Sequence, residues 1–167
     1  MKRVSTEKAF DRFKPSRCVF VISIDKNGKP NGMIAGQVMR CASEPSMIAI
    51  SLWKKGYTHK LIQQSKEFVI AVPNKELKKE FKFFGSTHGN KVDKFKETGI
   101  ETAKARFVKS PLIKKATINF ECKLEKEIDS GDHIIFIGRI LASYINKGMK
   151  VLLNMKKVGN KRIYQEF

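Results

Sequence analysis

The apolar positions along the chain predict a series of short strands. Continuous apolar runs at residues 18–24 and 68–72 are typical of strands buried on both faces. Residues 117–124 instead alternate, with Asn119 and Glu121 on the polar side, which predicts a strand with one wet or partner-facing side. The strands expected in order lie at residues 18–24, 31–41, 47–50, 68–72, 117–124 and 134–144.

Two glycine–asparagine pairs mark tight turns between strands. Asn27-Gly28 predicts a type I′ hairpin turn, because both central residues of that turn have positive φ. The return strand is expected at roughly residues 31–41, where Gly32 and Gly36 allow either a close approach by another segment or a flat ligand, or a bulge. Gly159-Asn160 predicts a small hairpin near the end of the chain.

Helical periodicity is confined to a few short segments. Thr58 is the expected N-cap of a helix through Ile62, another helix is expected at residues 75–84, and residues 4–13 are expected to form a short helix or arm. Roughly six or seven strands against two or three helices favour a mainly β fold, an antiparallel barrel with helices at its ends. Most gaps between strands are too short for parallel crossovers, and residues 1–167 are expected to form a single domain.

The net charge of +18 over 167 residues adds a strongly cationic surface to this barrel. Such a surface attracts phosphate cofactors, nucleic acid or acidic proteins, although a lysine-rich proteome explains it equally well. No apolar run approaches the roughly 18 residues of a membrane span, and the first residues show no signal-peptide core, so the cytoplasm is the expected location. Cys18, Cys41 and Cys122 form no C-x-x-C pair and are expected to be buried, structural thiols.

The stretch at residues 48–62 is the strongest candidate for chemistry. An apolar strand runs into Lys54 and Lys55, and Gly56 then allows a sharp turn into the helix. A helix start beside lysines favours an anion such as phosphate. An ordinary strand-turn-helix with solvated lysines is the alternative from this stretch alone. The chain lacks a glycine-rich dinucleotide fingerprint, a P-loop, a G-x-S-x-G elbow and zinc-ligand spacing, so no metal is expected.

Four pieces of the sequence, taken together, resemble one known family. They are NGMIAGQV at residues 31–38, the Pro45 strand running into KKGYTHKLI, FGSTHGNKVDKF at residues 84–95 and INFECKLEKEIDSGDHIIFIGRI at residues 118–140. Their order and spacing resemble the flavin reductase-like family, whose members have an FMN-binding split β-barrel. The flavoredoxin-like branch is the most similar, and the resemblance spans residues 15–140.

The resemblance implies a site for FMN. Lys54 would pair with the FMN phosphate, Tyr57 and Thr58 would donate hydrogen bonds to it, and the backbone around Ile34 would lie along the isoalloxazine ring. His133 would lie near the nicotinamide of a pyridine nucleotide. The residues that the resemblance places at the cofactor are Asn31, Met33, Ile34, Ala35, Ser51, Leu52, Trp53, Lys54, Tyr57, Thr58, Ser86, Lys91 and Lys94.

The resemblance also implies an oxidoreductase that passes electrons from NAD(P)H to flavin or another acceptor. A flavoredoxin-type electron-transfer protein, reduced by a protein partner, is the alternative. A basic nucleic-acid-binding barrel is a more remote one, because the aromatic residues mostly lie at core-like spacings. Family members bind flavin at a dimer interface, so a homodimer is expected, with the loop at residues 86–94 reaching the flavin of the partner chain.

Two features of the site are left open by the sequence. The chain has Ile34 where relatives often carry threonine, and Gln37 where they often carry tryptophan, which leaves the substrate side of the ring undefined. A donor or cation is expected near the N1–C2 carbonyl edge of the flavin, where reduction builds negative charge. The sequence does not say which residue supplies it.

Overall fold

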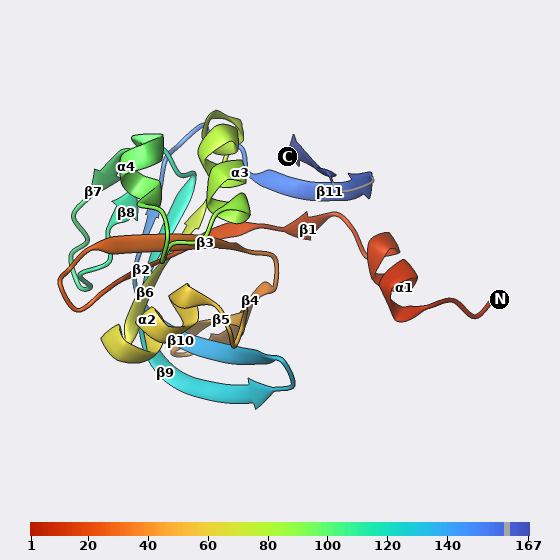
Figure 1. Ribbon diagram of the computed structural model, residues 1–167, viewed down its shortest axis with the longest axis horizontal. Coiled ribbons are helices and arrows are strands. Elements are labelled where there is room, and N and C mark those ends of the chain that lie inside the picture. Colours follow the sequence, from red (N-terminus) through yellow and green to blue (C-terminus); the bar gives the residue numbers. More distant parts are fainter. Residues whose placement is uncertain (159–160) are drawn as a thin grey trace.

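A seven-stranded antiparallel sheet forms the body of the protein. The computed structural model describes residues 1–158 and 161–167. The strands of this sheet are β2 (Val19–Ile24), β3 (Pro30–Ala35), β4 (Val38–Ser43), β5 (Ser46–Trp53), β6 (Glu67–Val72), β9 (Ile118–Ser130) and β10 (His133–Ile145). Their order is β3-β2-β6-β9-β10-β5-β4. Register shifts between β9 and β10 bend these long strands, and the sheet curls into a split barrel (Figure 1). The mainly β, antiparallel fold predicted from the sequence is confirmed.

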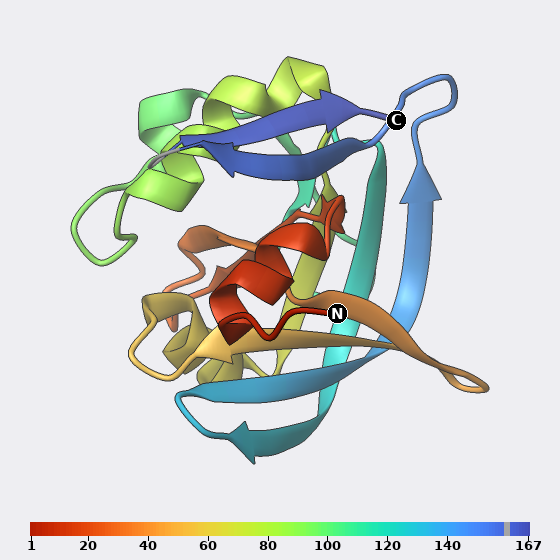
Figure 2. The same ribbon diagram turned by 90° about the vertical axis from the view of Figure 1, so that its right-hand side faces the viewer.

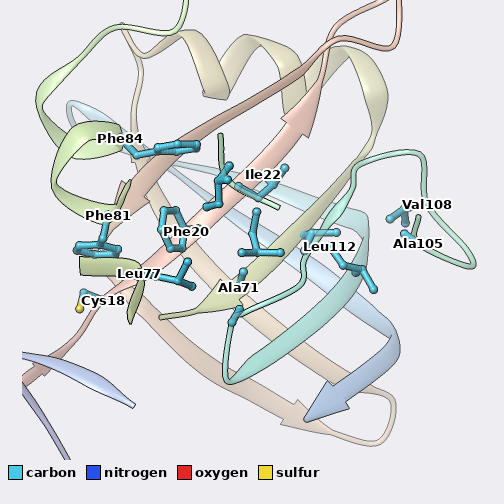
Figure 3. Packing of buried hydrophobic residues seen from close by; sticks show 14 residues of the cluster. Cys18, Phe20, Ile22, Ala71, Leu77, Phe81, Phe84, Ala105, Val108 and Leu112 are labelled. Carbon is cyan, nitrogen blue, oxygen red and sulfur yellow. The ribbon is translucent and has the colours of Figure 1, made fainter. Parts of the chain in front are cut away.

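The core lies on both faces of the sheet, because its central strands are apolar on both sides. All of β2 is buried. Its Phe20 meets Phe81 and Phe84 edge-on, with ring centroids 5.2 and 5.3 Å apart, which packs α3 (Lys78–Ser86) against one face (Figure 3). Phe68 and Phe136 belong to a second cluster on the other face. Burying each such side chain contributes roughly 1.5–3 kcal/mol, so these strands form a firm base for a site.

Short elements cover the ends and edges of this sheet. The helices besides α3 are α1 (Thr6–Arg12), α2 (Tyr57–Ser65), the 3-10 helix η1 (Lys75–Leu77) and α4 (Lys94–Thr98). The remaining strands are β1 (Ser16–Arg17), β7 (Thr102–Ala103), β8 (Leu112–Ile113), β11 (Leu152–Val158) and β12 (Lys161–Glu166). Helix α1 stands away from the sheet and lies in front of it in Figure 2. β11 and β12 pair as the expected tail hairpin, while its predicted turn, Gly159-Asn160, lies outside the described residues.

The first hairpin forms where Asn27-Gly28 predicted it, but the predicted type I′ turn is wrong. Gly28 has a φ of 80°, whereas Asn27 does not have a positive φ. The Asp25 carboxylate accepts hydrogen bonds from the backbone N–H groups of Asn27 and Lys29, at 2.9 and 2.8 Å. These bonds stabilise a turn that needs one left-handed residue instead of two.

The single return strand predicted at roughly residues 31–41 is two strands. β3 ends at Ala35 and β4 begins at Val38, and the two form opposite edges of the sheet. Ala35 lies in register with Val19, the first residue of β2, so β3 loses its partner there. Gly36 and Gln37 then carry the chain from one edge of the barrel to the other.

The polar side of β9 was predicted to be wet or partner-facing. Lys123 is exposed as predicted, but Asn119 and Glu121 are covered by their own chain. The side chain of Asn119 exchanges two hydrogen bonds of 3.0 Å with the backbone of Ile113. Glu121, which is fully buried, accepts hydrogen bonds from the backbone at residues 106–108. The alternation therefore predicted the strand correctly, but two of its polar side chains bind a loop.

The thiols divide into two environments. Cys18 and Cys122 are buried, as expected, and burial raises the pKa of Cys18 to about 12. The expectation is wrong for Cys41, which is exposed on the edge strand β4. Within residues 1–158 and 161–167, no helix is long and apolar enough to cross a membrane, and no three His, Cys, Asp or Glu side chains gather as a metal site.

Candidate functional site

An open cleft of about 460 Å³ lies where β3, the start of α2 and the loop between α3 and α4 meet. Its volume is within the range of roughly 300–1,000 Å³ typical of cofactor sites. Seven residues that the resemblance placed at the cofactor line this cleft: Met33, Ile34, Trp53, Tyr57, Thr58, Lys91 and Lys94. They are distant in sequence, so it is the fold that brings them together.

The cleft is cationic. Lys55, Lys60, Lys91 and Lys94 line it, and among the described residues no carboxylate does. Within the residues that the structure describes, none of these four lysines forms an ion pair. Gathered positive charges without counter-ions favour the binding of an anion.

The first turn of α2 adds backbone donors to this charge. Gly56 is the N-cap residue, with φ −72° and ψ 145°, and no described side chain caps the helix. Its first N–H groups therefore remain available beside Lys55 and Lys60, and the helix start carries a partial positive charge. Thr58, predicted as the N-cap, lies inside the helix because Gly56 takes the extended cap conformation.

Asn31 joins two walls of the cleft without lining it. Its side-chain Nδ2 donates to the Thr58 hydroxyl at 2.8 Å, which links β3 to α2. The α3–α4 loop approaches the Asn31 carboxamide at Gly89 so closely that a Cβ on Gly89 would overlap it. Only glycine permits this approach, and Asn31 thereby positions the residues that do line the cleft.

Lys94 is a buried residue of the cleft wall. Its Nζ donates to the backbone oxygens of Gly32, at 2.9 Å, and Phe84, at 2.7 Å, and so ties β3 to the end of α3. Burial lowers the pKa of Lys94 to about 8, because the charged ammonium loses hydration.

Lys54 and His133 lie beside the cleft and not in its lining. The Lys54 ammonium pairs with Asp129 at 2.6 Å, and Lys55 occupies the lining instead. His133 lies in register with Trp53 on the neighbouring strand, and its Nδ1 is 2.6 Å from the Asp132 carboxylate. The role of His133 near a nicotinamide stays a prediction.

Four further residues expected at the cofactor also lie outside the lining. Ala35 and Leu52 are buried in the core, and Ser51 is a half-buried residue of β5. The Ser86 hydroxyl donates to the Phe83 carbonyl, at 3.3 Å, one turn back in α3. Their contact with a cofactor stays a prediction.

Sequence reasoning missed Lys60 and Phe84 among the lining residues. Lys55 and Gly56 lie in the stretch that the sequence marked for an anion, although the resemblance did not place them at the cofactor. The same holds for the other lining residues of the α3–α4 segment: Gly85, Thr87, His88, Gly89 and Asn90. Helical spacing could have found Lys60, which lies one turn after Tyr57. The α3–α4 loop was expected to reach the flavin of a partner chain. In the structure it lines the cleft of its own chain.

This fold is that of a flavoprotein family. The flavin reductase like domain matches residues 12–160, so the chain belongs to that family, as its resemblance predicted.

Similar proteins include some that are named for redox functions. An uncharacterized protein of Archaeoglobus fulgidus is 37% identical over 113 residues, which cover 68% of this chain and just under two thirds (64%) of that protein. A ferric-chelate reductase (NAD(P)H) of the same organism is 30% identical over 142 residues, covering 84% of this chain and 82% of that protein. Flavoredoxin from Methanosarcina acetivorans superposes with a TM-score of 0.80 at 25% identity, covering 92% of this chain and 85% of that structure. The last similarity agrees with the flavoredoxin-like branch expected from the sequence.

Proposed function

We propose that this protein is an FMN-binding oxidoreductase that passes electrons from NAD(P)H to flavin or another acceptor. The observation that carries the proposal is the cationic cleft, free of carboxylates among the described residues, in a chain of a flavin-binding family. The similarity to a reductase named for NAD(P)H supports this choice of donor.

The phosphate of FMN fits the α2 side of the cleft. Lys55 and Lys60 supply charge, and the uncapped first turn of α2 supplies N–H donors. Two unit charges about 4 Å apart interact by roughly 4 kcal/mol at an effective dielectric near 20, before desolvation is subtracted. Tyr57 and Thr58 line the same side and are placed to add hydroxyl donors. Lys54, the residue implied by the resemblance, would first have to leave Asp129.

The ring of FMN fits the β3 side of the cleft. Met33 and Ile34 offer a half-buried apolar surface, and the exposed Trp53, at the end of β5, lines the same cleft. Bound flavin supplies the hydride and electron chemistry. The residues of the chain hold the ring, keep water from one side of it and place charge near it.

Purified protein is expected to be yellow, or to become so when FMN is added, and the bound flavin is expected to bleach on mixing with NADH or NADPH. Absorbance titration followed by anaerobic stopped-flow mixing measures both steps. A protein that binds no FMN contradicts the proposal outright. Bound FMN that neither nucleotide reduces contradicts the NAD(P)H route alone.

In that last case the second candidate function takes over, a flavoredoxin-type protein reduced by a protein partner. The structural similarity to a flavoredoxin favours it, and the net charge of +18 would attract an acidic redox protein. Bleaching by a reduced acidic iron–sulfur protein, with rates that fall as salt rises, is its signature.

We further propose that two copies pair and that the flavin lies at their interface. Helix α1 supports the pairing, because it has only seven residues and buries none of them, whereas isolated helices shorter than roughly 12–15 residues are marginal in water. Its Phe10 and Phe13 are 64% and 80% exposed. An apolar groove of about 260 Å³, lined in part by Met39, Ile48 and Phe120, is open on the same chain. The α1 arm of a second copy is the occupant that we assign to this groove.

Light scattering after size-exclusion chromatography tests the pairing. The protein is expected to have the mass of a dimer. The double variant Phe10→Ser, Phe13→Ser is expected to dissociate into monomers at protein concentrations at least tenfold higher than those at which the wild type does. Phe107→Ser, which changes an exposed phenylalanine outside the arm, is the matched control. A monomeric protein contradicts the dimer, and a dimer unchanged by the double variant contradicts the role of the arm.

A further inference from the structure

Lys94 is a buried cation without an anionic partner in the part of the chain that the structure describes. The residue is only 4% exposed. An ammonium has three N–H donors, and two of them are used by the carbonyl oxygens of Gly32 and Phe84. Among the described residues, no carboxylate pairs with it, and burial alone accounts for its lowered pKa. A buried, unpaired charge costs free energy, and an anion bound in the cleft would offset that cost.

The charged groups of the surrounding elements leave this ammonium uncompensated. On its own helix, Asp93 is engaged as the N-cap of α4 and in an ion pair of 3.0 Å with Lys29, and Glu97 is exposed. From the α3–α4 loop, His88 and Lys91 line the cleft. From α2, the lining side chains that carry charge are again lysines, Lys55 and Lys60.

The cleft therefore has two cationic regions of different character. Lys55 and Lys60, beside the start of α2, are exposed and suit a doubly charged, hydrated phosphate. Lys94 is buried and is tied to Gly32, the residue before the apolar pair Met33 and Ile34. Its surroundings suit the polar edge of a flat, largely apolar ring, where a charge appears only on reduction.

We propose that Lys94 is the cation that compensates the negative charge placed on the flavin ring by reduction, so that the protein binds reduced FMN more tightly than oxidised FMN. The inference rests on the proposed FMN function. A hydride from NAD(P)H carries two electrons and one proton to the ring and breaks one C–H bond of the nicotinamide. The ring gains one negative charge, which the protonated form of Lys94 compensates, and Lys94 passes no proton to the ring. By linkage, if the protonated form of Lys94 favours reduction of the ring, then the reduced ring favours the protonated form of Lys94 to the same extent.

The protonation of Lys94 reports this coupling directly. In protein labelled with [13C]lysine, the Lys94 signal is identified by its loss in Lys94→Arg and titrated by NMR between pH 7 and pH 9.5. Its midpoint is expected near pH 8 in the flavin-free protein. Oxidised FMN is expected to move it little, and reduction with dithionite is expected to raise it by about one unit or more, with riboflavin giving the same rise as FMN.

Affinity gives the matching measurement. Lys94→Met is expected to weaken binding of reduced FMN at least tenfold relative to oxidised FMN, whereas Lys96→Met, an exposed change on the same helix, is expected to leave this ratio unchanged. A rise with oxidised FMN but not with riboflavin would assign Lys94 to the phosphate and overturn the inference. Flavin that binds in both states without moving the Lys94 titration also overturns it, and the wild-type titration decides even where Lys94→Met fails to fold. A protein that binds no flavin removes the proposed function, and this inference with it.

Discussion

Replacing both Lys55 and Lys60 with alanine is expected to weaken FMN binding by about a hundredfold or more. A hydrogen bond to a charged group is worth roughly 1.5–3 kcal/mol, and each 1.4 kcal/mol corresponds to about tenfold in affinity. Both lysines are exposed and line the cleft, so the fold is expected to tolerate their loss. Quenching of FMN fluorescence measures the affinity. Riboflavin, which lacks the phosphate, is expected to bind the variant and the wild type alike.

Two single variants complete this experiment. Lys79→Ala changes an exposed lysine of α3 and is expected to leave the affinity unchanged. Lys54→Ala breaks the pair with Asp129 and is expected to have less effect than Lys55→Ala. A greater loss in Lys54→Ala would return the phosphate to the residue that the family resemblance implies. An unchanged affinity in the double variant would remove the phosphate from the α2 side of the cleft.

Replacing Glu121 with alanine is expected to lower the free energy of unfolding by about 3–5 kcal/mol, because it leaves a set of buried hydrogen-bond donors without an acceptor. The carboxylate accepts hydrogen bonds from the Tyr144 hydroxyl, at 2.6 Å, and from the backbone N–H groups of Arg106, Phe107 and Val108. Urea denaturation measures the change.

The matched control for this change is Glu125→Ala. Glu125 lies on the same strand and forms a partly exposed ion pair with Arg139, at 2.9 Å. Exposed pairs contribute roughly 0–1 kcal/mol, so this variant is expected to stay close to the wild type. Equal losses of stability in the two variants would contradict the stabilising role of the hydrogen bonds that Glu121 accepts.

The contribution of Glu121 is also expected to depend on pH. Burial tends to raise the pKa of its carboxyl, but the four hydrogen bonds outweigh burial and hold that pKa below its ordinary value of 4.5. The unfolded chain therefore binds a proton at a higher pH than the folded one. The stabilisation is fully present above about pH 4.5 and is lost as the pH falls through the lowered pKa. The stability difference between wild type and Glu121→Ala is expected to shrink in that acidic range.

Local sequence patterns predicted the strands well and their connections less well. The apolar runs marked β2 and β6, because burial on both faces leaves a continuous signature. The break at Gly36 and Gln37 was missed, because it depends on where β2 begins to pair, and β2 is another part of the chain. The covering of Glu121 was missed for a similar reason, since no local pattern around residue 121 indicates that a loop elsewhere in the sequence binds its side chain.

The candidate site shows the same limit. The stretch around Tyr57 and Thr58 identified one wall, because a strand exit, lysines and a helix start are local features. The choice between Lys54 and Lys55 depends on Asp129, which attracts one of the two lysines away from the cleft. The burial of Lys94 likewise depends on the carbonyl groups of Gly32 and Phe84, and so it could be found only in the folded chain.

The pairing of β5 with β10 has a consequence for how the protein reaches this structure. It places Trp53, at the edge of the cleft, opposite His133, far along the chain. Contacts between residues so distant in sequence form slowly, because a long loop must close before any pairing rewards it. During synthesis, α2 (residues 57–65) emerges well before β10 (residues 133–145), the strand that pairs with β5. All residues that line the cleft lie between Met33 and Lys94, so its walls are synthesised before β10, and we expect the closure of the sheet by β10, rather than the gathering of those walls, to be the slow step before a flavin is held firmly.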